Sequence, residues 1–467
     1  MRISTAIRSM RSETLAAMKL RLPIPLLAIL AGLGLSGCGP ATTSQDAAKQ
    51  VIIFDIDTLR ADRLGCYGAE RPTSPHIDRL AAESVLFEWA FAQGPNTPPS
   101  QTSILTGLYP SHHGRVFALD VLADEVVTLA EVMRDGGFVT AAFVDGGNMA
   151  AASGLNQGFE MYRSTPGGGF EVIGPRVMRW LSRHVNDDFL LLVHTYDVHS
   201  PYDPPEPHRS MFVEDRQPTT PDFEPTTDIL TDVMIRARRG EQDILSSQDI
   251  DYALARYDGG VHYVDQWMGT FLEKMRRLGI YDNSTIILLS DHGEEFQEHG
   301  SVLHEKLYTT VSRIPLIIRP PGGRKTFRVP QVVESIDLMP TILEMVGVEL
   351  PPTPIDGESL LPLMTGQSQG PYFALSESRF FGGRDAIASG GRHLLRSRKT
   401  GFLELYAFTE DPTELSHLQP ERRDEAMALR AQLDSRRPSG ERGSVEEQIT
   451  DSEIIDQLKA LGYLNDE

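Results

Sequence analysis

The chain has 467 residues, a formal net charge of −21, 40% hydrophobic residues and 23% charged residues. This length allows a large hydrophobic core, and the composition is that of an ordinary globular protein. The negative charge argues against a nucleic-acid partner, because binding to phosphate backbones depends on basic surface. An anionic substrate would have to be attracted locally, by a metal ion and a few basic groups. With two cysteines, Cys38 and Cys66, no disulfide framework is expected.

The first 38 residues have the pattern of a bacterial lipoprotein signal. Scattered basic residues precede an apolar run from Leu22 to Leu35, which is too short to span a membrane. The run ends in Ser-Gly-Cys, which resembles a lipobox, so Cys38 is the predicted lipidation site. Residues 39–49 then form a polar tether, and the predicted location is the bacterial cell envelope, with the membrane as partner through the lipid anchor. An ordinary cleaved signal is the alternative, and Met18 is an alternative start.

The rest of the chain alternates between apolar runs and helical patterns. Apolar runs predict buried strands at 51–54, 138–144, 189–194 and 284–290. Apolar spacing predicts helices at 75–92, 128–134, 177–183, 250–278 and 337–343. The charged, proline-containing residues 206–247 are expected to form an excursion over the rim of the site. Such alternation favours an α/β fold with a mainly parallel sheet flanked by helices.

Polar residues follow three of the predicted strands. Asp55 and Asp57 follow the first strand, Asp197 and His199 come after the third, and the pair Asp291-His292 follows the fourth. Open α/β sheets build their sites at the carboxyl ends of strands. An adjacent carboxylate and imidazole are good metal ligands, and imidazole favours Mn²⁺ or Zn²⁺ over Ca²⁺. His199 can donate a hydrogen bond or act as a general acid near neutral pH.

The stretch from Gly94 to Gly114 contains the expected nucleophile that these polar residues would serve. Thr97-Pro98-Pro99-Ser100 reads as a turn entering a short helix that Gly107 ends. A helix N-terminus suits an anionic ester, so a hydroxyl nucleophile is expected here. The order Thr97-x-Pro-Ser, then Leu-Thr-Gly-x-Tyr-Pro and His-Gly, resembles the sulfatase signature within the alkaline phosphatase superfamily. Sulfatases carry a cysteine, converted to formylglycine, at the place of Thr97 and usually an arginine at the place of Gln101.

This resemblance extends over roughly residues 50–465 and implies a role for each matching residue. It implies a catalytic domain over 50–368 and a C-terminal subdomain over 369–467, with a small antiparallel sheet and terminal helices. One divalent cation (Mn, Zn, Mg or Ca, with the Mn or Zn type preferred) is expected on Asp57, Asp291, His292 and the Thr97 oxygen, with Asp55 as a fallback ligand. Thr97 is the expected nucleophile, and no formylglycine is expected. His199 and His304 are expected to contact the substrate and to be catalytic, and Lys306 is a further expected substrate contact. His299 is expected to brace the Asp-His-Gly loop, residues 291–293.

The expected activity is hydrolysis of phosphate esters, phosphate diesters or phosphonates, because two departures from the sulfatase pattern point toward phosphoesterases. Thr97 replaces the cysteine, and His292 stands where sulfatases commonly have an asparagine. A genuine sulfuric ester hydrolase is the nearest alternative, since the fold alone does not choose between the ester types. A transferase passing a phospho-alcohol group is a further alternative, although the multispanning region typical of such enzymes is missing. A catalytically silent, glycan-binding surface lipoprotein is the non-enzymatic alternative, and Gln101 is its best support.

Overall fold

The computed structural model describes residues 49–464 apart from 214–215, 368–369, 371, 419–420, 437–444 and 446. The predicted signal, the predicted lipidation site Cys38 and most of the predicted tether therefore lie outside the described residues. Among the described helices, none has both the length and the apolar character needed to cross a bilayer.

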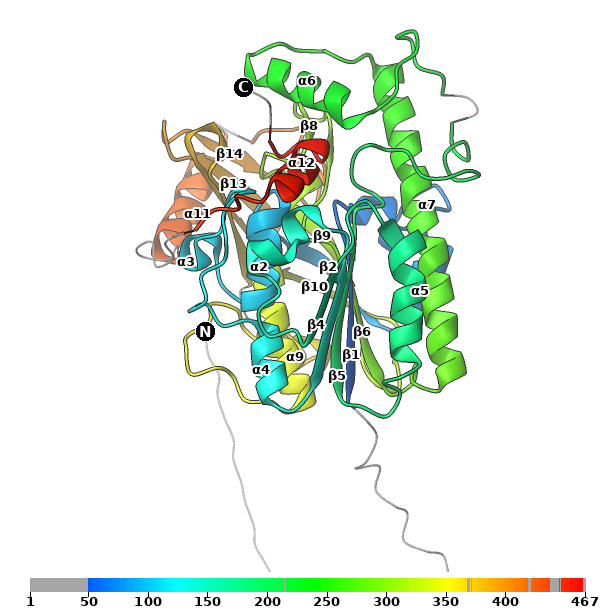
Figure 1. The fold of residues 1–467 in the computed structure, drawn as a ribbon. Coiled ribbons are helices and arrows are strands. Elements are labelled where there is room, and N and C mark those ends of the chain that lie inside the picture. The colour runs from blue at the N-terminus through cyan, green and yellow to red at the C-terminus, as the bar shows by residue number, and fades with distance from the viewer. Residues whose placement is uncertain are drawn as a thin grey trace, which may run out of the picture. The chain divides into compact units, whose positions relative to one another are not determined.

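An eight-stranded sheet forms the centre of the described part (Figure 1). Its strand order is β10-β2-β9-β6-β1-β5-β3-β4, and within it only β9 runs antiparallel to its neighbours. The strands of this sheet are β1 (Gln50–Ile56), β2 (Val85–Phe91), β3 (Val139–Val144), β4 (Met161–Ser164), β5 (Phe189–Thr195), β6 (Ser284–Leu289), β9 (Arg313–Arg319) and β10 (Phe327–Glu334). The predicted mainly parallel α/β fold is confirmed.

Helices cover both faces of this sheet, as Figure 1 shows for α5 and α7 on one side and α2, α4 and α9 on the other. The helices are α1 (Pro75–Ala81), α2 (Thr97–Thr106), α3 (Pro110–His113), α4 (Leu129–Asp135), α5 (Gly169–Leu181), α6 (Thr227–Arg238), α7 (Ser247–Leu278), α8 (Thr309–Ser312), α9 (Leu338–Val346), α10 (Leu361–Met364), α11 (Arg423–Arg436) and α12 (Ser452–Ala460). The long helix predicted at 250–278 is therefore confirmed, as α7.

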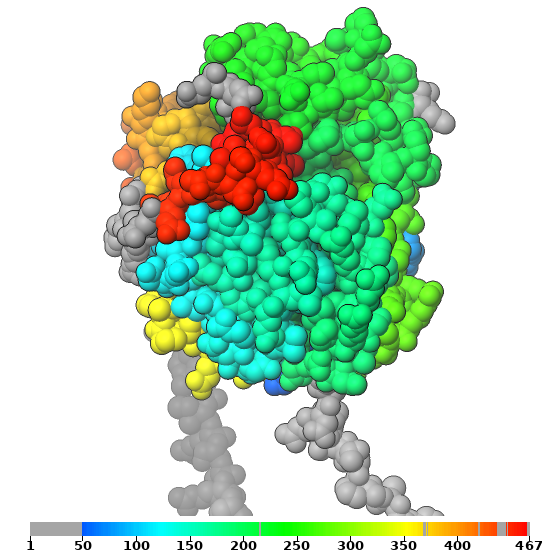
Figure 2. Space-filling view, in the orientation of Figure 1, coloured from blue at the N-terminus to red at the C-terminus, as the bar shows by residue number. Residues whose placement is uncertain are grey.

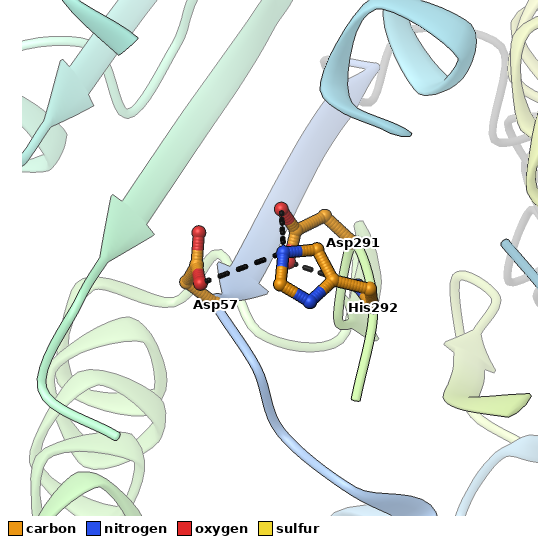
Figure 3. A group of neighbouring side chains, drawn as sticks. All are labelled: Asp57, Asp291 and His292. Carbon is orange, nitrogen blue, oxygen red and sulfur yellow. Dashed lines mark hydrogen bonds and ion pairs between the residues drawn. The ribbon is translucent and has the colours of Figure 1, made fainter. Parts of the chain in front are cut away.

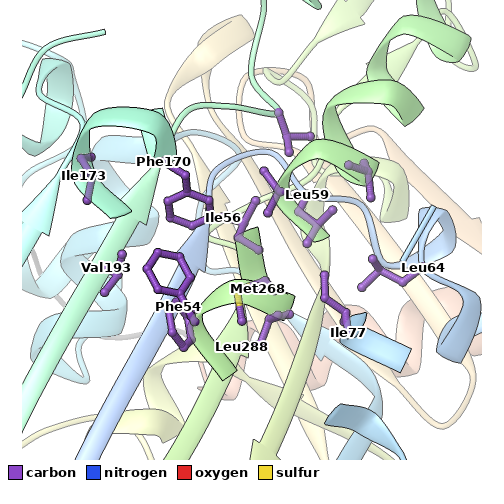
Figure 4. Close-up of a cluster of buried hydrophobic side chains, with 14 of the residues drawn as sticks. Phe54, Ile56, Leu59, Leu64, Ile77, Phe170, Ile173, Val193, Met268 and Leu288 are labelled. Carbon is purple, nitrogen blue, oxygen red and sulfur yellow. The ribbon is translucent and has the colours of Figure 1, made fainter. Parts of the chain in front are cut away.

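Successive residues of β1 serve two separate cores, because side chains alternate between the faces of a strand. Ile52 and Phe54 belong to the core beneath α5 and α7, and Figure 4 shows Phe54 among the buried side chains of this core. The Phe54 ring lies 5.2 Å from that of Phe271. Val51 and Ile53 belong to the core on the opposite face, which includes side chains from α2, α4 and α9. Burial on both faces holds β1 in a fixed register and so fixes the position of the residues that follow it.

A smaller antiparallel sheet occupies the C-terminal part, as predicted. It consists of β11 (Phe373–Ser378), β12 (Arg384–Ser389), β13 (Arg392–Ser397) and β14 (Leu403–Tyr406), while β7 (Glu295–Phe296) and β8 (Val302–Leu303) form a separate hairpin. Apolar residues of the four-stranded sheet, among them Leu375, Ile387 and Leu394, pack against Leu429 and Leu433 of α11.

Two expectations about helix ranges were wrong in part. The helix predicted at 75–92 ends at Ala81, and β2 follows, because Val85–Phe91 is rich in aromatic residues and pairs with both β9 and β10. The helix predicted at 177–183 begins earlier, at Gly169. The excursion predicted at 206–247 contains the helix α6.

Candidate active site and metal centre

Three side chains form a cluster suited to a metal ion at the carboxyl ends of two adjacent strands. Asp57 follows β1, and Asp291 and His292 follow β6 (Figure 3). One ligand atom from each residue lies within 4.8 Å of the others, and all three side chains are buried. The Nε2 atom of His292 lies 3.4 Å from Asp291 Oδ2 and 3.9 Å from Asp57 Oδ1. The structure therefore brings together the three side chains that the sequence predicted as ligands.

The hydroxyl of Thr97 lies against this cluster. Thr97 is the first residue of α2, and its Oγ1 donates a hydrogen bond to Asp57 Oδ2 at 3.1 Å. The same oxygen lies 3.4 Å from His292 Nε2. Pro98 fits the first turn of α2 because its missing N–H would have no helical partner there, and Gly107 ends the helix in a left-handed conformation at φ +66°. The N-terminus of α2 thus places a buried hydroxyl at the positive end of a helix dipole.

Carboxylates are crowded at this centre. Burial, and then the nearby charge of Asp291, raises the pKa of Asp55 and of Asp57 well above the usual carboxyl range. Asp57 Oδ1 and Asp291 Oδ2 are buried and accept no hydrogen bond from the described residues. Such groups are costly unless a cation or a proton offsets their charge. The donor set of buried carboxylates and an imidazole therefore fits a divalent cation.

Four buried histidines, His292 of the cluster and three beside it, are in the neutral form. Burial lowers the pKa of His194, His199, His292 and His304 to about 4. The rings of His292 and His304 lie 4.4 Å apart, and those of His199 and His304 lie 5.1 Å apart. Neutral imidazoles keep a lone pair, which a metal ligand or a proton acceptor needs.

Hydrogen bonds at Nδ1 define which ring nitrogen carries that lone pair. His292 Nδ1 lies 2.9 Å from the Gly293 carbonyl oxygen, and His199 Nδ1 lies 2.8 Å from that of Ser200. A carbonyl only accepts, so both rings carry the proton on Nδ1 and present a bare Nε2. His304 is held similarly, by Glu294 Oε1 at 3.0 Å from its Nδ1. The bare Nε2 of His292 is the atom that faces Asp57 and Asp291.

The backbone after Asp57 is held in an unusual conformation. Thr58 has φ +58°, which is uncommon for a β-branched residue, and its side chain is fully buried. The hydroxyl of Tyr257, from α7, donates to the Thr58 carbonyl at 2.7 Å and accepts from the Arg60 N–H at 2.8 Å. These two hydrogen bonds of Tyr257, here called the Tyr257 clasp, stabilise the turn that carries Asp57. A strained backbone conformation persists only where surrounding contacts hold it in place.

Lys306 and His299 lie together beside this centre. Lys306 Nζ donates to the His299 carbonyl at 2.6 Å and lies 3.5 Å from Glu295 Oε1. The His299 ring stacks on Tyr308 at 3.5 Å, and the backbone N–H of His299 donates to Glu295 Oε1 at 2.9 Å. None of the contacts found for Lys306 joins it to Thr97 or to the cluster, so its contact with a substrate stays a prediction.

Three residues at the site were missed by sequence reasoning. His194 is the last residue but one of β5, and its Nε2 lies 3.4 Å from Asp57 Oδ2. Its place at the end of a buried strand, directly beside the Asp57 strand, was a signal that could have identified it. Glu294 follows the Asp-His-Gly segment, but no pattern indicated that it would face His304. Tyr463 arrives from the C-terminal segment, and its hydroxyl lies 2.5 Å from Thr97 Oγ1.

Comparison with known proteins matches two family models to the chain. The sulfatase model matches residues 49–348, and the model of the N-sulphoglucosamine sulphohydrolase C-terminal region matches residues 297–438. An arylsulfatase of Clostridium perfringens is 23% identical over 79% of this chain and 89% of its own length. An N-acetylglucosamine-6-O-sulfatase of Bacteroides thetaiotaomicron is 23% identical over 77% of this chain and 78% of its own length.

Solved structures share the fold at lower identity. The phosphonate monoester hydrolase of Agrobacterium radiobacter has a TM-score of 0.69 and 19% identity, covering 83% of this chain and 95% of its own. A structure in complex with its substrate, D-glucosamine-2-N,6-O-disulfate, has a TM-score of 0.70 and 19% identity, covering 83% of this chain and 97% of its own.

Proposed function

Because the chain belongs to the sulfatase family, we propose that this member hydrolyses phosphate diesters, phosphonate monoesters or related anionic esters through the unmodified hydroxyl of Thr97. One observation carries the proposal. Thr97 Oγ1 lies at the N-terminus of α2, 3.1 Å from Asp57 and 3.4 Å from His292. A hydroxyl in contact with two metal-ligand candidates is arranged for activation as a nucleophile.

Asp57, Asp291 and His292 would hold one divalent cation, with the Thr97 oxygen beside it. A bound cation lowers the pKa of a neighbouring hydroxyl and polarises an ester oxygen. The mixed carboxylate and imidazole set favours Mn²⁺ or Zn²⁺ over Ca²⁺, which prefers a larger set of oxygen ligands.

Thr97 and Asp57 would carry out the first step. As Thr97 Oγ1 forms its bond to phosphorus, Asp57 Oδ2 is the atom placed to accept the hydroxyl proton, because it already accepts that hydrogen bond. The bond from phosphorus to the leaving oxygen breaks on the opposite side. Water then attacks the phospho-threonine, and the phosphorus–Thr97 bond breaks to restore the hydroxyl.

His199 and His304 would serve the leaving oxygen and the remaining phosphoryl oxygens. Their pKa values of about 4 make both rings proton acceptors before substrate binds. An anionic ester favours the protonated form of a nearby imidazole, so substrate binding raises these pKa values. A ring protonated at Nε2 can then donate to the leaving oxygen, in agreement with the role predicted for these residues.

Sulfate esters are the second candidate substrate. The two curated relatives described above are named as sulfatases, and sulfate resembles phosphate in its tetrahedral shape. The proposed location, at the cell envelope through a lipid on Cys38, rests on the N-terminal sequence pattern alone.

The proposal is tested with a panel of p-nitrophenyl esters and several metals. Metal-stripped protein is reloaded with Mn²⁺, Zn²⁺, Mg²⁺ or Ca²⁺ and assayed with p-nitrophenyl phosphate, its diester, a phenylphosphonate ester and the sulfate. We expect the diester or the phosphonate to give the highest kcat/KM with Mn²⁺ or Zn²⁺. Preference for the sulfate would establish the second candidate. Absence of turnover with every ester and metal would refute both and favour a silent glycan-binding protein.

A further inference from the structure

Tyr463 occupies the space directly in front of Thr97. Its hydroxyl lies 2.5 Å from Thr97 Oγ1 and 3.4 Å from His199 Nε2. The ring of Tyr463 lies 5.8 Å from the rings of both His199 and His304. A residue close to the end of the chain therefore contacts the proposed nucleophile and a proposed substrate-binding histidine together.

An ester cannot react while Tyr463 is in this position. Attack requires the phosphorus or sulfur atom to approach within about 3–3.5 Å of the nucleophilic oxygen. The Tyr463 hydroxyl lies inside that distance, on the side of Thr97 that faces His199. Tyr463 and a bound ester would therefore compete for the same space.

The segment that carries Tyr463 is anchored at its base. Ile449 N–H donates to the Leu119 carbonyl at 2.8 Å, and Asp120 pairs with Gln448 in an isolated β-bridge. Farther along, the Gly147 N–H donates to Gln457 Oε1 at 3.1 Å. These contacts lead the chain from the side of the domain to the carboxyl ends of the central strands.

Beyond this base the attachment is shallow. Leu458 is the one fully buried residue of α12, and no residue from Leu461 to Leu464 is fully buried. Figure 2 shows this segment in red on the surface, and α12 contacts the η3 turn, Gly147–Met149. A cavity of about 230 Å³ adjoins it, lined by Asn96, Arg238, His304, Phe380 and Tyr463 among others. Elements with few buried contacts open at low free energy.

We propose that residues 452–464 are an intramolecular plug, in which Tyr463 takes the place of the ester and must leave before substrate enters. This inference rests on the proposed function, which places the reacting ester in front of Thr97. The plug would make this protein a partly closed enzyme, whose apparent affinity for substrate falls in proportion to the fraction of molecules that are open.

Two variants remove the plug, and two others serve as controls. Tyr463→Ala removes the ring, and a chain ending at Asp451 removes the segment while keeping the bridge at Gln448. We expect both to lower KM about tenfold with little change in kcat, as a tenfold excess of closed over open molecules would give. Tyr463→Phe keeps the ring and should gain less than Tyr463→Ala. Asp456→Ala, at an exposed position of α12, should match the parent protein.

Two outcomes would contradict the proposed plug. If Tyr463→Ala and the shortened chain both keep the parent melting temperature and show an equal or lower kcat/KM, the segment does not compete with substrate. If Tyr463→Phe loses as much activity as Tyr463→Ala, the hydroxyl takes part in the reaction instead. The melting temperature of each variant is measured to detect misfolding. If one of the two plug-removing variants misfolds, the other still tests the proposal.

Two readouts do not need turnover and separate this inference from the proposed function. Binding of inorganic phosphate and of sulfate to metal-loaded protein is measured by calorimetry, and Tyr463→Ala should bind at least one of them more tightly. Saturating phosphate should also speed hydrogen exchange of the amides in 452–464. Equal or weaker anion binding by the variant, or slower exchange, would refute the plug even if no ester is ever hydrolysed.

Discussion

At the scale of single residues, the central feature is a set of buried carboxylates placed close together. Asp57 and Asp291 contribute ligand atoms within 4.8 Å of one another, and the pKa of Asp57 is raised by burial and by the charge of Asp291. A protein that keeps like charges together in its interior loses stability unless a cation or protons offset them.

We predict that Asp291→Asn has opposite effects on stability with and without metal. In chelator-treated protein at neutral pH, loss of one charge beside Asp57 should raise the free energy of unfolding by about 1–2 kcal/mol, given about 1.4 kcal/mol for a tenfold change in proton affinity. Added Mn²⁺ or Zn²⁺ should stabilise the parent protein by about 3 kcal/mol at a hundredfold excess over Kd, and the variant much less. Thermal unfolding with and without metal measures both.

Asp124→Asn, in an exposed loop, is the matched control and should follow the parent protein. The prediction fails if Asp291→Asn gains as much from metal as the parent does, because the carboxylate would then not be a ligand.

At the scale of elements, the site depends on the contact between α7 and the turn after β1. Tyr257 joins the Thr58 carbonyl to the Arg60 N–H and so holds the turn that carries Asp57. Supporting hydrogen bonds of this kind tune metal affinity, although the residue that makes them need not be a ligand.

We predict that Tyr257→Phe costs about 1–3 kcal/mol of stability, because two buried backbone groups lose their partner. Metal affinity should fall up to about tenfold as the turn loosens, which calorimetric titration with Mn²⁺ would measure. Tyr252→Phe is the control from the same helix: its hydroxyl accepts a hydrogen bond from Arg256 instead. Equal metal affinity in the two variants would show that the clasp does not position Asp57.

Much of the arrangement of elements could be predicted, because buried strands and the long helix α7 have strong patterns. The strands around Asp57 and Asp291 and the small C-terminal sheet lie where the sequence indicated. β2 was mistaken for helix, because Val85–Phe91 continues the apolar spacing of α1 and only pairing with β9 and β10 makes it a strand. The position of Tyr463 depends on how the C-terminal segment docks, which local sequence does not encode.

At the scale of the whole molecule, an acidic chain buries several carboxyl groups away from cations. Burial raises the pKa of Asp145 and of Asp265 to about 7, from an ordinary value of 3.8. Asp145 accepts hydrogen bonds from the N–H groups of Gly168, Gly169 and Tyr196, which only partly offset the burial. These two carboxyl groups therefore bind protons more tightly in the folded protein than in the unfolded chain between about pH 4 and pH 7.

We predict that the contribution of Asp145 to the free energy of unfolding falls as pH rises from about 4 to about 7, since its carboxyl holds a proton in the folded state that the unfolded chain has released. Replacing the carboxyl by a neutral amide in Asp145→Asn should remove this contribution from the measured slope, even if lost hydrogen bonds lower stability at every pH. Urea unfolding at several pH values, in the presence of a chelator, measures the slope. A slope as steep in the variant as in the parent would show that Asp145 titrates normally.

The proposed mechanism depends most on the unmodified Thr97 hydroxyl as the attacking group. Measuring kcat for Thr97→Ala beside Thr97→Ser tests this role directly. With the ester that the parent protein hydrolyses best, Thr97→Ala should lose at least about 10³-fold in kcat, as removal of a nucleophile does. Thr97→Ser, which keeps a hydroxyl, should retain much more activity, and both should still bind metal. If Thr97→Ala keeps more than about a tenth of the parent kcat, Thr97 is not the attacking group.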